Sequence, residues 1–324
     1  MLRFDSLMAA LFFTVFSAGL INNAHAEERA LHQIQTDDVE IPANGYLVEE
    51  IGDRLFWFSD GFQQSFFMTT GEGVIVVDAP PSMIDKYLDA IAQTTREPIT
   101  HVIYSHAHTD HIGAADRMPQ DAIRIAHQLT HESLARANDP RRPLPTQTFV
   151  DRMVLTIGNQ VLELSYEGPN HLSGNVILYA PRQKVLSLMD FLFTGSSPFP
   201  YLGHAEDIPG LMRHHDILLG YDFDVFVSGH IARAATRADI ELQRQYLHDL
   251  RDHTDAVLAE TSVFDTFQRL GPETAMMSAM SMWLDEMAEE VSNRMLETWA
   301  GRMPGIETTT RYNAVPMIQS RRVD

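Results

Sequence analysis

The sequence predicts an α+β fold in which two β-sheets pack face to face, helices cover their outer faces, and a helical segment follows. Two β-rich halves, at residues 46–105 and 161–230, each contain a stretch with helical periodicity. From about Arg233 onward the periodicity is helical. Elements with one apolar face bury it by packing in layers, so this order predicts a sandwich with a helical extension.

The first half begins with apolar and aromatic runs separated by glycine-containing turns, which predict strands within residues 46–81. The run Val74–Val77 is apolar without alternation, as in a strand buried on both faces. Residues 81–95 carry apolar side chains at i, i+3, i+4 and i+7 and predict a helix. Residues 98–105 then predict another buried strand, and a polar motif follows it directly.

The second half repeats this pattern. Residues 161–168, 175–181 and 183–193 predict strands, residues 207–221 predict a helix, and residues 223–230 predict a strand that ends in glycine and histidine. Strand ends of such layers are where functional sites gather.

The C-terminal part predicts helices over residues 237–261 and 272–305. The second segment is rich in methionine at helical spacing: Met276, Met277, Met280, Met282, Met287 and Met295. Methionine in this pattern usually fills a core, which predicts a helix packed on the main domain. The alternative is a pliable apolar lid over a substrate pocket.

The N-terminal 26 residues have the pattern of a cleaved secretory signal. An apolar run, Leu7–Leu20, precedes Ala24-His25-Ala26, which fits the small-x-small rule for cleavage. The run is shorter than the ~20 residues of a membrane span, which argues against an anchor. We therefore expect an exported protein, periplasmic or secreted, that is not an integral membrane protein.

Composition limits the partners and the kinds of metal ligand. The formal net charge is −20, from 44 acidic and 24 basic residues, and no basic cluster is present, so nucleic acid is not an expected partner. The chain has no cysteine, so any metal must be held by nitrogen and oxygen. The oligomeric state is not predicted.

The segment "YSHAHTDHIGAA" (residues 104–115) concentrates potential metal ligands. His106 and His108 are two apart on an extended segment, so their side chains point the same way. Asp110 and His111 lie where the chain turns into a helix expected to start at Ile112, and they face differently. This density has no packing rationale, which indicates a metal site. One turn can offer ligands to two metals about 3.5 to 4 Å apart.

Other candidate ligands occur at further strand ends. His171 lies in a glycine- and proline-containing loop between two strands, and His230 ends an apolar strand. Asp190 is alone in the apolar run 183–193, where a metal would offset the cost of burying a carboxylate. A salt bridge or a cap at a strand end is the alternative for Asp190.

Together these residues resemble the metallo-β-lactamase superfamily, from about Leu47 to Asp239. The resemblance rests on the paired early strands, the strand "GVIVVDAPP", the His-x-His-x-Asp-His signature, and the later ligand types in family order. It implies a four-layer αββα sandwich as the catalytic domain at residues 27–250. Residues 251–324 would form a mainly helical extension packed on the core.

The resemblance also implies two zinc ions. The expected ligands of the first zinc ion are His106, His108 and His171. Those of the second are Asp110, His111 and His230, and Asp190 is expected to bridge both ions. Asp78 would be a structural aspartate that supports the histidine loop. The iron-based members have glutamate where this chain has His108, which favours hydrolysis.

The implied reaction is hydrolysis of a carbonyl compound, because zinc lowers the pKa of water to about 7. Asp110 would orient the nucleophile and relay its proton. The absence of cysteine and the bridging Asp190 favour a small-molecule ester, lactone or thioester substrate. Export favours the alternative, a periplasmic β-lactam hydrolase. A third possibility is a metal- or partner-binding protein without turnover.

Overall fold

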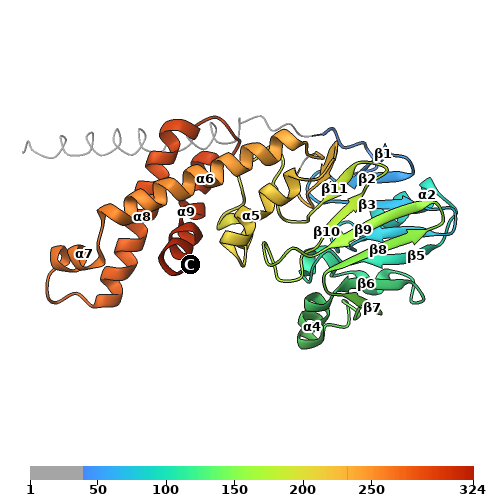
Figure 1. Cartoon of the computed structure of the whole chain (residues 1–324), viewed down its shortest axis with the longest axis horizontal. Helices are drawn as coiled ribbons and strands as arrows, with labels where there is room; N and C mark the ends of the chain where they lie inside the picture. The colour runs from blue at the N-terminus through green and yellow to red at the C-terminus, as the bar shows by residue number, and fades with distance from the viewer. Residues whose placement is uncertain (1–38, 232) are drawn as a thin grey trace, which may run out of the picture. The chain divides into compact units, whose positions relative to one another are not determined.

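The computed structural model describes residues 39–231 and 233–324, which belong to one compact unit (Figure 1). The predicted signal peptide lies outside the described residues.

The first sheet has seven strands in chain order. Strands β1 to β4 pair antiparallel, and β4 to β7 pair parallel. The strands are β1 (Leu47–Gly52), β2 (Leu55–Ser59), β3 (Gln64–Thr69), β4 (Val74–Val77), β5 (Ile99–Ile103), β6 (Ile123–His127) and β7 (Gln147–Phe149).

The second sheet has five strands in the order β12-β11-β10-β9-β8. Only β11 and β12 run parallel; the other neighbours are antiparallel. The strands are β8 (Arg152–Ile157), β9 (Gln160–Ser165), β10 (Ile177–Ala180), β11 (Val185–Ser187) and β12 (Val225–Val227). Each sheet thus places parallel strands beside one another, and the carboxyl ends of parallel strands meet at one edge.

Two apolar cores lie on the two faces of the first sheet. In β4, Val74 and Val76 point into a core shared with helix α2 (Ile84–Thr94), whereas Ile75 and Val77 point into the core between the two sheets. All four side chains are fully buried, as the unbroken apolar run predicted.

A third core covers the outer face of the second sheet. Leu186 of β11 and Phe226 of β12 pack with side chains of α5 (Ile208–Leu219) and α6 (Arg237–Glu260). The layers therefore run helix, sheet, sheet, helix, which confirms the predicted αββα sandwich (Figure 1). The short helices α3 (Thr109–Ile112) and α4 (Gln128–Ala137) belong to the first half.

The third core continues into the C-terminal helices. Helices α7 (Val263–Leu270), α8 (Met276–Trp299) and α9 (Ile306–Val323) follow α6, and α8 and α9 pack on it (Figure 1). On α8, Met287 and Met295 are buried in this core, while Met277 is 74% exposed. Met276 and Met282 are also exposed, so the predicted core filling is confirmed for Met287 and Met295 and is wrong for the three exposed methionines.

Three predicted element boundaries differ from the structure, two in the sandwich and one in the helical extension. The strand expected over 183–193 ends at Ser187, because the chain turns at Asp190, whose φ is 61° and whose N–H donates to the Ser228 carbonyl oxygen. The helix expected from Ile112 begins earlier, at Thr109, directly after extended His108.

The helix expected over 272–305 ends at Trp299, because Gly301 and Gly305 take positive φ values. Helix α9 then begins; it lies within the extension predicted to be mainly helical, but it was not predicted as a separate helix. The predicted division at residue 250 lies inside continuous α6.

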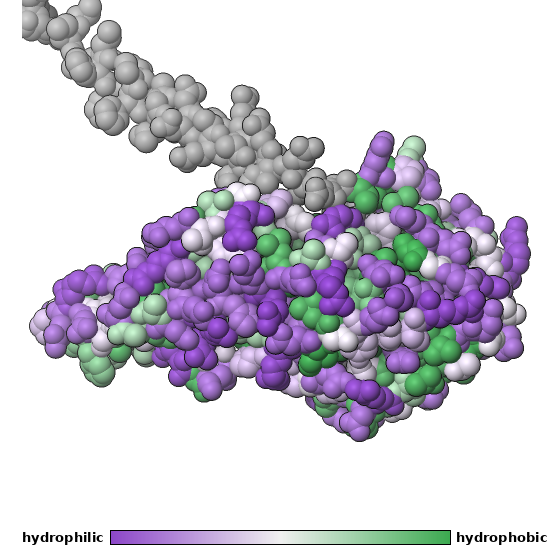
Figure 2. All heavy atoms as spheres, turned by 45° about the horizontal axis from the view of Figure 1, so that its top comes forward, coloured by the Kyte–Doolittle hydropathy of each residue, from purple (hydrophilic) through white to green (hydrophobic). Residues whose placement is uncertain are grey.

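The surface is mainly hydrophilic on the face that Figure 2 shows, with apolar residues in small separate groups. This agrees with the strongly acidic composition. Among the described residues, no helix combines the length and the apolar composition that a membrane span needs.

Candidate metal centre

Strand ends from both sheets bring the predicted ligands together. In the first sheet, Asp78 follows β4 and the histidine motif follows β5; in the second, Asp190 follows β11 and His230 follows β12. His171 comes from the loop between β9 and β10. The ligand types that lie far apart in the sequence therefore meet at one edge of the sandwich.

The first group consists of His106, His108, His171 and Asp190. His171 Nε2 lies 3.0 Å from His108 Nδ1 and 3.2 Å from Asp190 Oδ2. His106 Nε2 lies 3.6 Å from the same carboxylate oxygen. Three imidazoles and one carboxylate thus face a common point.

The second group consists of Asp110, His111, His230 and Asp190. The other carboxylate oxygen, Asp190 Oδ1, lies 2.9 Å from His111 Nε2 and 3.1 Å from His230 Nε2. His230 Nε2 also lies 3.3 Å from Asp110 Oδ2. The two groups therefore share Asp190, which presents one oxygen to each.

This donor set fits metal ions. Zinc–nitrogen bonds of about 2.0 to 2.1 Å in a tetrahedron separate the ligand atoms by roughly 3.3 Å, and the separations above lie on both sides of that value. Nε2 of His106 is buried and, within the described part of the chain, has no hydrogen-bond partner. A cation bound within the first group would supply the partner that this nitrogen lacks.

Asp78 supports two of the histidines from behind. Its carboxylate accepts hydrogen bonds from the Ser105 N–H (2.8 Å) and hydroxyl (2.7 Å), and it lies 3.2 Å from His111 Nδ1. The Ser105 hydroxyl in turn lies 3.0 Å from His106 Nδ1. With Nδ1 of His111 donating to a carboxylate, Nε2 of that ring is left free for a metal.

A buried amide network joins the loops of His171 and Asp190. Asn170 Oδ1 accepts from the His171 N–H (2.7 Å) and from Asn175 Nδ2 (3.0 Å), while Asn170 Nδ2 faces His214 Nε2 (3.3 Å). Asn175 Nδ2 also donates to the Met189 carbonyl oxygen (2.8 Å). These contacts fix how the two loops lie against each other.

Gly229 gives the ligands room. Its φ is 93°, which favours glycine, and a Cβ there would lie 3.1 Å from His111 Cε1 and 3.2 Å from Asp190 Oδ1. A side chain at this position would push against both groups.

Burial and charge set different pKa values around the centre. Burial lowers the pKa of His106 well below its usual range and that of His108 to about 4, so both rings are neutral at pH 7, the form that binds metal. Burial also lowers the pKa of His230, but hydrogen bonds to Asp110 and Asp190 outweigh burial and raise it to about 9. A metal at the second group must therefore displace a proton.

Aromatic side chains border the second group. Phe62, at the turn between β2 and β3, has its ring centroid 5.6 Å from that of His230 and is 59% exposed. The Phe199 ring lies 5.9 Å from His230 and 6.5 Å from Phe62. An apolar wall thus stands beside the candidate metal ligands.

The structure brings all seven predicted metal ligands into these two groups. The supporting residues Asn170, Asn175, His214 and Gly229 were not predicted from the sequence. Their signals are local: asparagine on both sides of His171 in "PNHLSGN", and glycine directly before His230 in "SGH".

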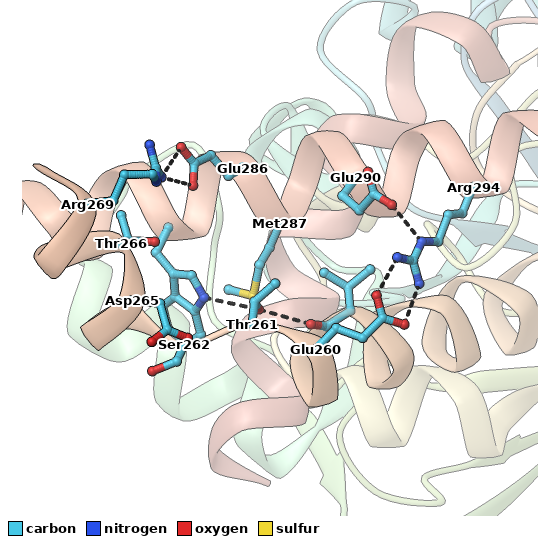
Figure 3. Close-up of a pocket in the computed structure, with 12 residues that line it drawn as sticks. Glu260, Thr261, Ser262, Asp265, Thr266, Arg269, Glu286, Met287, Glu290 and Arg294 are labelled. Atoms are coloured by element: carbon cyan, nitrogen blue, oxygen red, sulfur yellow. Dashed lines mark hydrogen bonds and ion pairs between the residues drawn. The ribbon is translucent and has the colours of Figure 1, made fainter.

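A pocket of about 520 Å³ lies within the helical extension, between α6, α7 and α8 (Figure 3). Its charged side chains pair with one another: Arg269 with Glu286 (2.6 Å), and Arg294 with Glu260 (2.6 Å) and Glu290 (2.8 Å). None of its lining residues is a candidate metal ligand, so the pocket is not part of the metal centre.

The fold and site define a class of protein: an αββα sandwich with a histidine- and aspartate-rich candidate metal site at the edge of its sheets. The chain belongs to the metallo-beta-lactamase superfamily, whose family model matches residues 59–230.

Curated relatives and solved structures are similar to parts of the chain. The 2,4-dinitroanisole O-demethylase subunit alpha of Nocardioides sp. (strain JS1661) is 33% identical over 221 residues, 63% of this chain and 66% of that protein. A metallo-beta-lactamase type 2 of Bacillus cereus is 25% identical over 122 residues, 37% of this chain and 47% of that protein. The chain thus spans less than two thirds of each of these relatives.

Among solved structures, a metallo-beta-lactamase from Pontibacter korlensis has a TM-score of 0.55 at 20% identity. The match covers 63% of this chain and 99% of that one. At this identity the similarity shows the shared fold alone.

Proposed function

We propose that the protein is a hydrolase that holds two zinc ions at the paired ligand groups and cleaves an ester or lactone bond. The observation that carries the proposal is Asp190, whose two carboxylate oxygens face the two groups separately. A carboxylate shared in this way suits two metals about 3.5 to 4 Å apart, and such a pair would supply a nucleophile at neutral pH and polarise the bond to be cleaved.

In this proposal the residues of the site have three roles: holding the metal ions, orienting the ligands and admitting the substrate. His106, His108 and His171 hold one side of the centre, and His111 and His230 hold the other. Asp78 and the Asn170 network keep the rings oriented. The substrate enters from the side on which Asp110 is open to solvent, because that side chain is 52% exposed, whereas the ligand histidines are buried except for His108, which is half-buried.

Asp110 is the proton carrier in this proposal. Burial raises its pKa, but the hydrogen bond with His230 and the charge of His111 outweigh burial, so its pKa lies below the usual value and it is ionised at neutral pH. An ionised, partly exposed carboxylate beside the attacking water can accept its proton and pass it to the leaving oxygen.

A second candidate reaction is hydrolysis of an activated aryl methyl ether, ArOCH₃ + H₂O → ArOH + CH₃OH. The similarity to the O-demethylase subunit, at 33% identity, favours it. The Phe62 and Phe199 rings beside His230 also suit an aryl group.

Hydrolysis of a β-lactam ring is the third reaction to compare, because the predicted export signal would bring the chain to the compartment where β-lactams act. The type 2 metallo-beta-lactamases match this chain at lower identity and over a shorter segment than the O-demethylase subunit does. The bridging carboxylate also favours ester or lactone cleavage over this reaction.

Elemental analysis and a substrate panel test the proposal. The protein is expressed with added zinc, purified, and assayed on phenyl acetate, an acyl homoserine lactone, 2,4-dinitroanisole and a cephalosporin. We expect two zinc ions per chain and faster turnover of the ester or the lactone. Fewer than one zinc per chain would contradict the two-metal centre. Zinc binding without turnover of any substrate would instead favour a binding protein.

A further inference from the structure

The loop that follows Asp190 borders the metal centre on two sides. In its middle it carries Phe199, whose ring lies 5.9 Å from the ring of His230 in the second ligand group. At its end the Glu206 N–H donates to the His171 carbonyl oxygen (2.9 Å), and the Glu206 carboxylate accepts from the Ser173 N–H. The path of this loop therefore decides where Phe199 lies relative to the candidate ligands.

The loop contains a left-handed turn that most side chains disfavour. Tyr201, Leu202, Gly203 and His204 have φ values of 62°, 54°, 63° and 58°. For L-residues with a Cβ this region is sterically costly, and such a turn persists only where its surroundings hold it. A Cβ on Gly203 would lie 2.8 Å from the Phe193 ring, so the turn is also closely packed.

Helix α9 stabilises this turn through one buried amide side chain, that of Asn313. Asn313 Oδ1 accepts from the Leu202 N–H (2.9 Å), and its Nδ2 donates to the Pro198 carbonyl oxygen (3.1 Å). One side chain thus ties both ends of the segment that carries Phe199. Asn313 is fully buried, so these hydrogen bonds are shielded from water.

The start of α9 adds further contacts. The Ser197 hydroxyl lies 2.7 Å from the Thr309 hydroxyl, and the Ser197 N–H donates to the Pro304 carbonyl oxygen (2.9 Å). The Tyr201 ring lies 5.6 Å from the Tyr312 ring. The loop is therefore fixed along its length by a helix that lies outside the αββα sandwich.

We propose that Asn313 of α9 is a positioning residue for substrate recognition. It holds Phe199 beside His230, so that the C-terminal extension sets the preference for substrates with an aromatic or bulky apolar group next to the cleaved bond. The expected effect on substrate preference rests on the proposed hydrolase function. The anchoring of the loop is independent of that function.

The test compares Asn313→Ala with Gln319→Ala, which removes an exposed amide side chain from the same helix. In N313A we expect faster hydrogen exchange of the Leu202 amide, by about 3- to 10-fold, because it loses its acceptor. The amides of β4 and β5 and the zinc content should not change. Unchanged exchange at Leu202 overturns the proposal, whether or not any ester is hydrolysed.

Kinetics with two acetate esters separate positioning from general damage. In N313A the KM for phenyl acetate is expected to rise about 3- to 10-fold through the loss of an aromatic contact, while kcat/KM for methyl acetate stays within about twofold of the wild type. Equal losses on both esters would overturn the recognition role. If the wild-type protein hydrolyses neither ester, the proposed function fails on these substrates, and exchange at Leu202 still decides the anchoring.

Thr309→Val covers the case in which N313A does not fold. It removes the hydroxyl contact with Ser197 and keeps the shape of a half-buried side chain. Faster exchange at the start of the loop, at residues 197–200, with zinc content unchanged, supports the anchoring of this loop by α9. Wild-type exchange in T309V together with unfolded N313A overturns it.

Discussion

Asp190 combines strain with function at the level of a single residue. Its φ of 61° is unusual for a residue with a side chain and costs roughly 1–2 kcal/mol. The cost is offset by its N–H, which donates to the Ser228 carbonyl oxygen, and by the histidine nitrogens around its carboxylate. In this conformation one carboxylate oxygen lies beside each of the two ligand groups.

Asp190→Asn should therefore lower metal binding. The amide has one oxygen and one N–H₂ group, so it can face only one of the two ligand groups with an acceptor. We expect loss of at least one zinc per chain and a fall in hydrolysis of at least about 100-fold. Elemental analysis and steady-state kinetics measure this; full zinc content with reduced thermal stability alone would mean that Asp190 is merely structural.

The buried side chain of His215 should make the stability of the fold sensitive to acid, independently of metal binding. Burial lowers its pKa to about 3, so in the folded protein it stays neutral, donates to the Leu211 carbonyl oxygen and faces Gln243 Nε2. Between pH 3 and 6.5 the unfolded chain binds this proton and the folded chain does not. The contribution to stability is therefore complete above pH 6.5 and is lost as the pH falls toward 3.

His215→Asn removes this titration. The difference in unfolding free energy between wild type and variant should be flat from pH 7 to 9. Below pH 6.5 it should shrink by up to about 1.4 kcal/mol per pH unit. Urea unfolding at several pH values measures it, and a difference independent of pH down to 4 would contradict the prediction.

At the level of elements, the site depends on loops from both sheets being locked together. Asn175 begins the stretch before β10, yet it donates to Asn170 beside His171 and to the Met189 carbonyl oxygen beside Asp190. It therefore couples the β9–β10 loop to the end of β11.

Asn175→Ala should loosen this coupling. We expect a 10- to 100-fold lower zinc affinity, which is the usual effect of removing a residue that orients metal ligands. We also expect the free energy of unfolding to fall by about 1–3 kcal/mol, because Asn170 Oδ1 loses one hydrogen-bond donor and the Met189 carbonyl oxygen loses its donor. Competition with a chromogenic chelator measures the affinity. Exposed Asn293→Ala on α8 is the matched control, and equal affinities in both variants would contradict the role.

At the level of the whole molecule, one apolar core connects the second sheet with the helical extension. It includes Leu186 of β11, Leu247 of α6, Trp299 of α8 and Met317 of α9. A continuous core means that sandwich and extension stabilise each other, and we expect them to unfold together.

The fluorescence of the three tryptophans can test whether sandwich and extension unfold together. Trp57 lies in β2, and Trp283 and Trp299 lie in α8. The variants W57F and W283F/W299F therefore follow the extension and the sandwich separately by fluorescence. Each variant's fluorescence midpoint should match the midpoint from its own circular dichroism. Transitions that differ between the two signals would mean that the extension is an independent unit.

Metal removal should also act on the whole molecule. A bound ion stabilises the folded state by about 4 kcal/mol when its free concentration is 1,000 times its dissociation constant. Chelation should therefore lower the melting temperature by several degrees, and added zinc should restore it. Calorimetry with and without chelator tests this, and an unchanged melting temperature would contradict metal binding at the two groups.

Periodicity predicted most elements, because local patterns record which face of an element is buried. The strand Val74–Val77 and the helix near residues 84–94 lie where the sequence placed them. The turn at Asp190 was missed, since a positive φ at a residue with a side chain depends on distant contacts, here with Ser228. The start of α9 was also missed, although Gly301 and Gly305, which take positive φ values before it, are of the residue type that commonly ends a helix.

The amino-acid sequence was enough to predict the ligand types, because so many histidines and aspartates at strand ends have no role in apolar packing. It was also enough to predict the order of layers, through apolar spacing. The folded chain was needed to show that Asp190 turns one oxygen toward each group, that Asn170 and Asn175 couple two loops, and that Asn313 reaches the loop of Phe199. The contacts of Asn175 with Met189 and of Asn313 with Pro198 join residues 14 and 115 positions apart, and no local pattern records a pairing that exists only once the chain has folded.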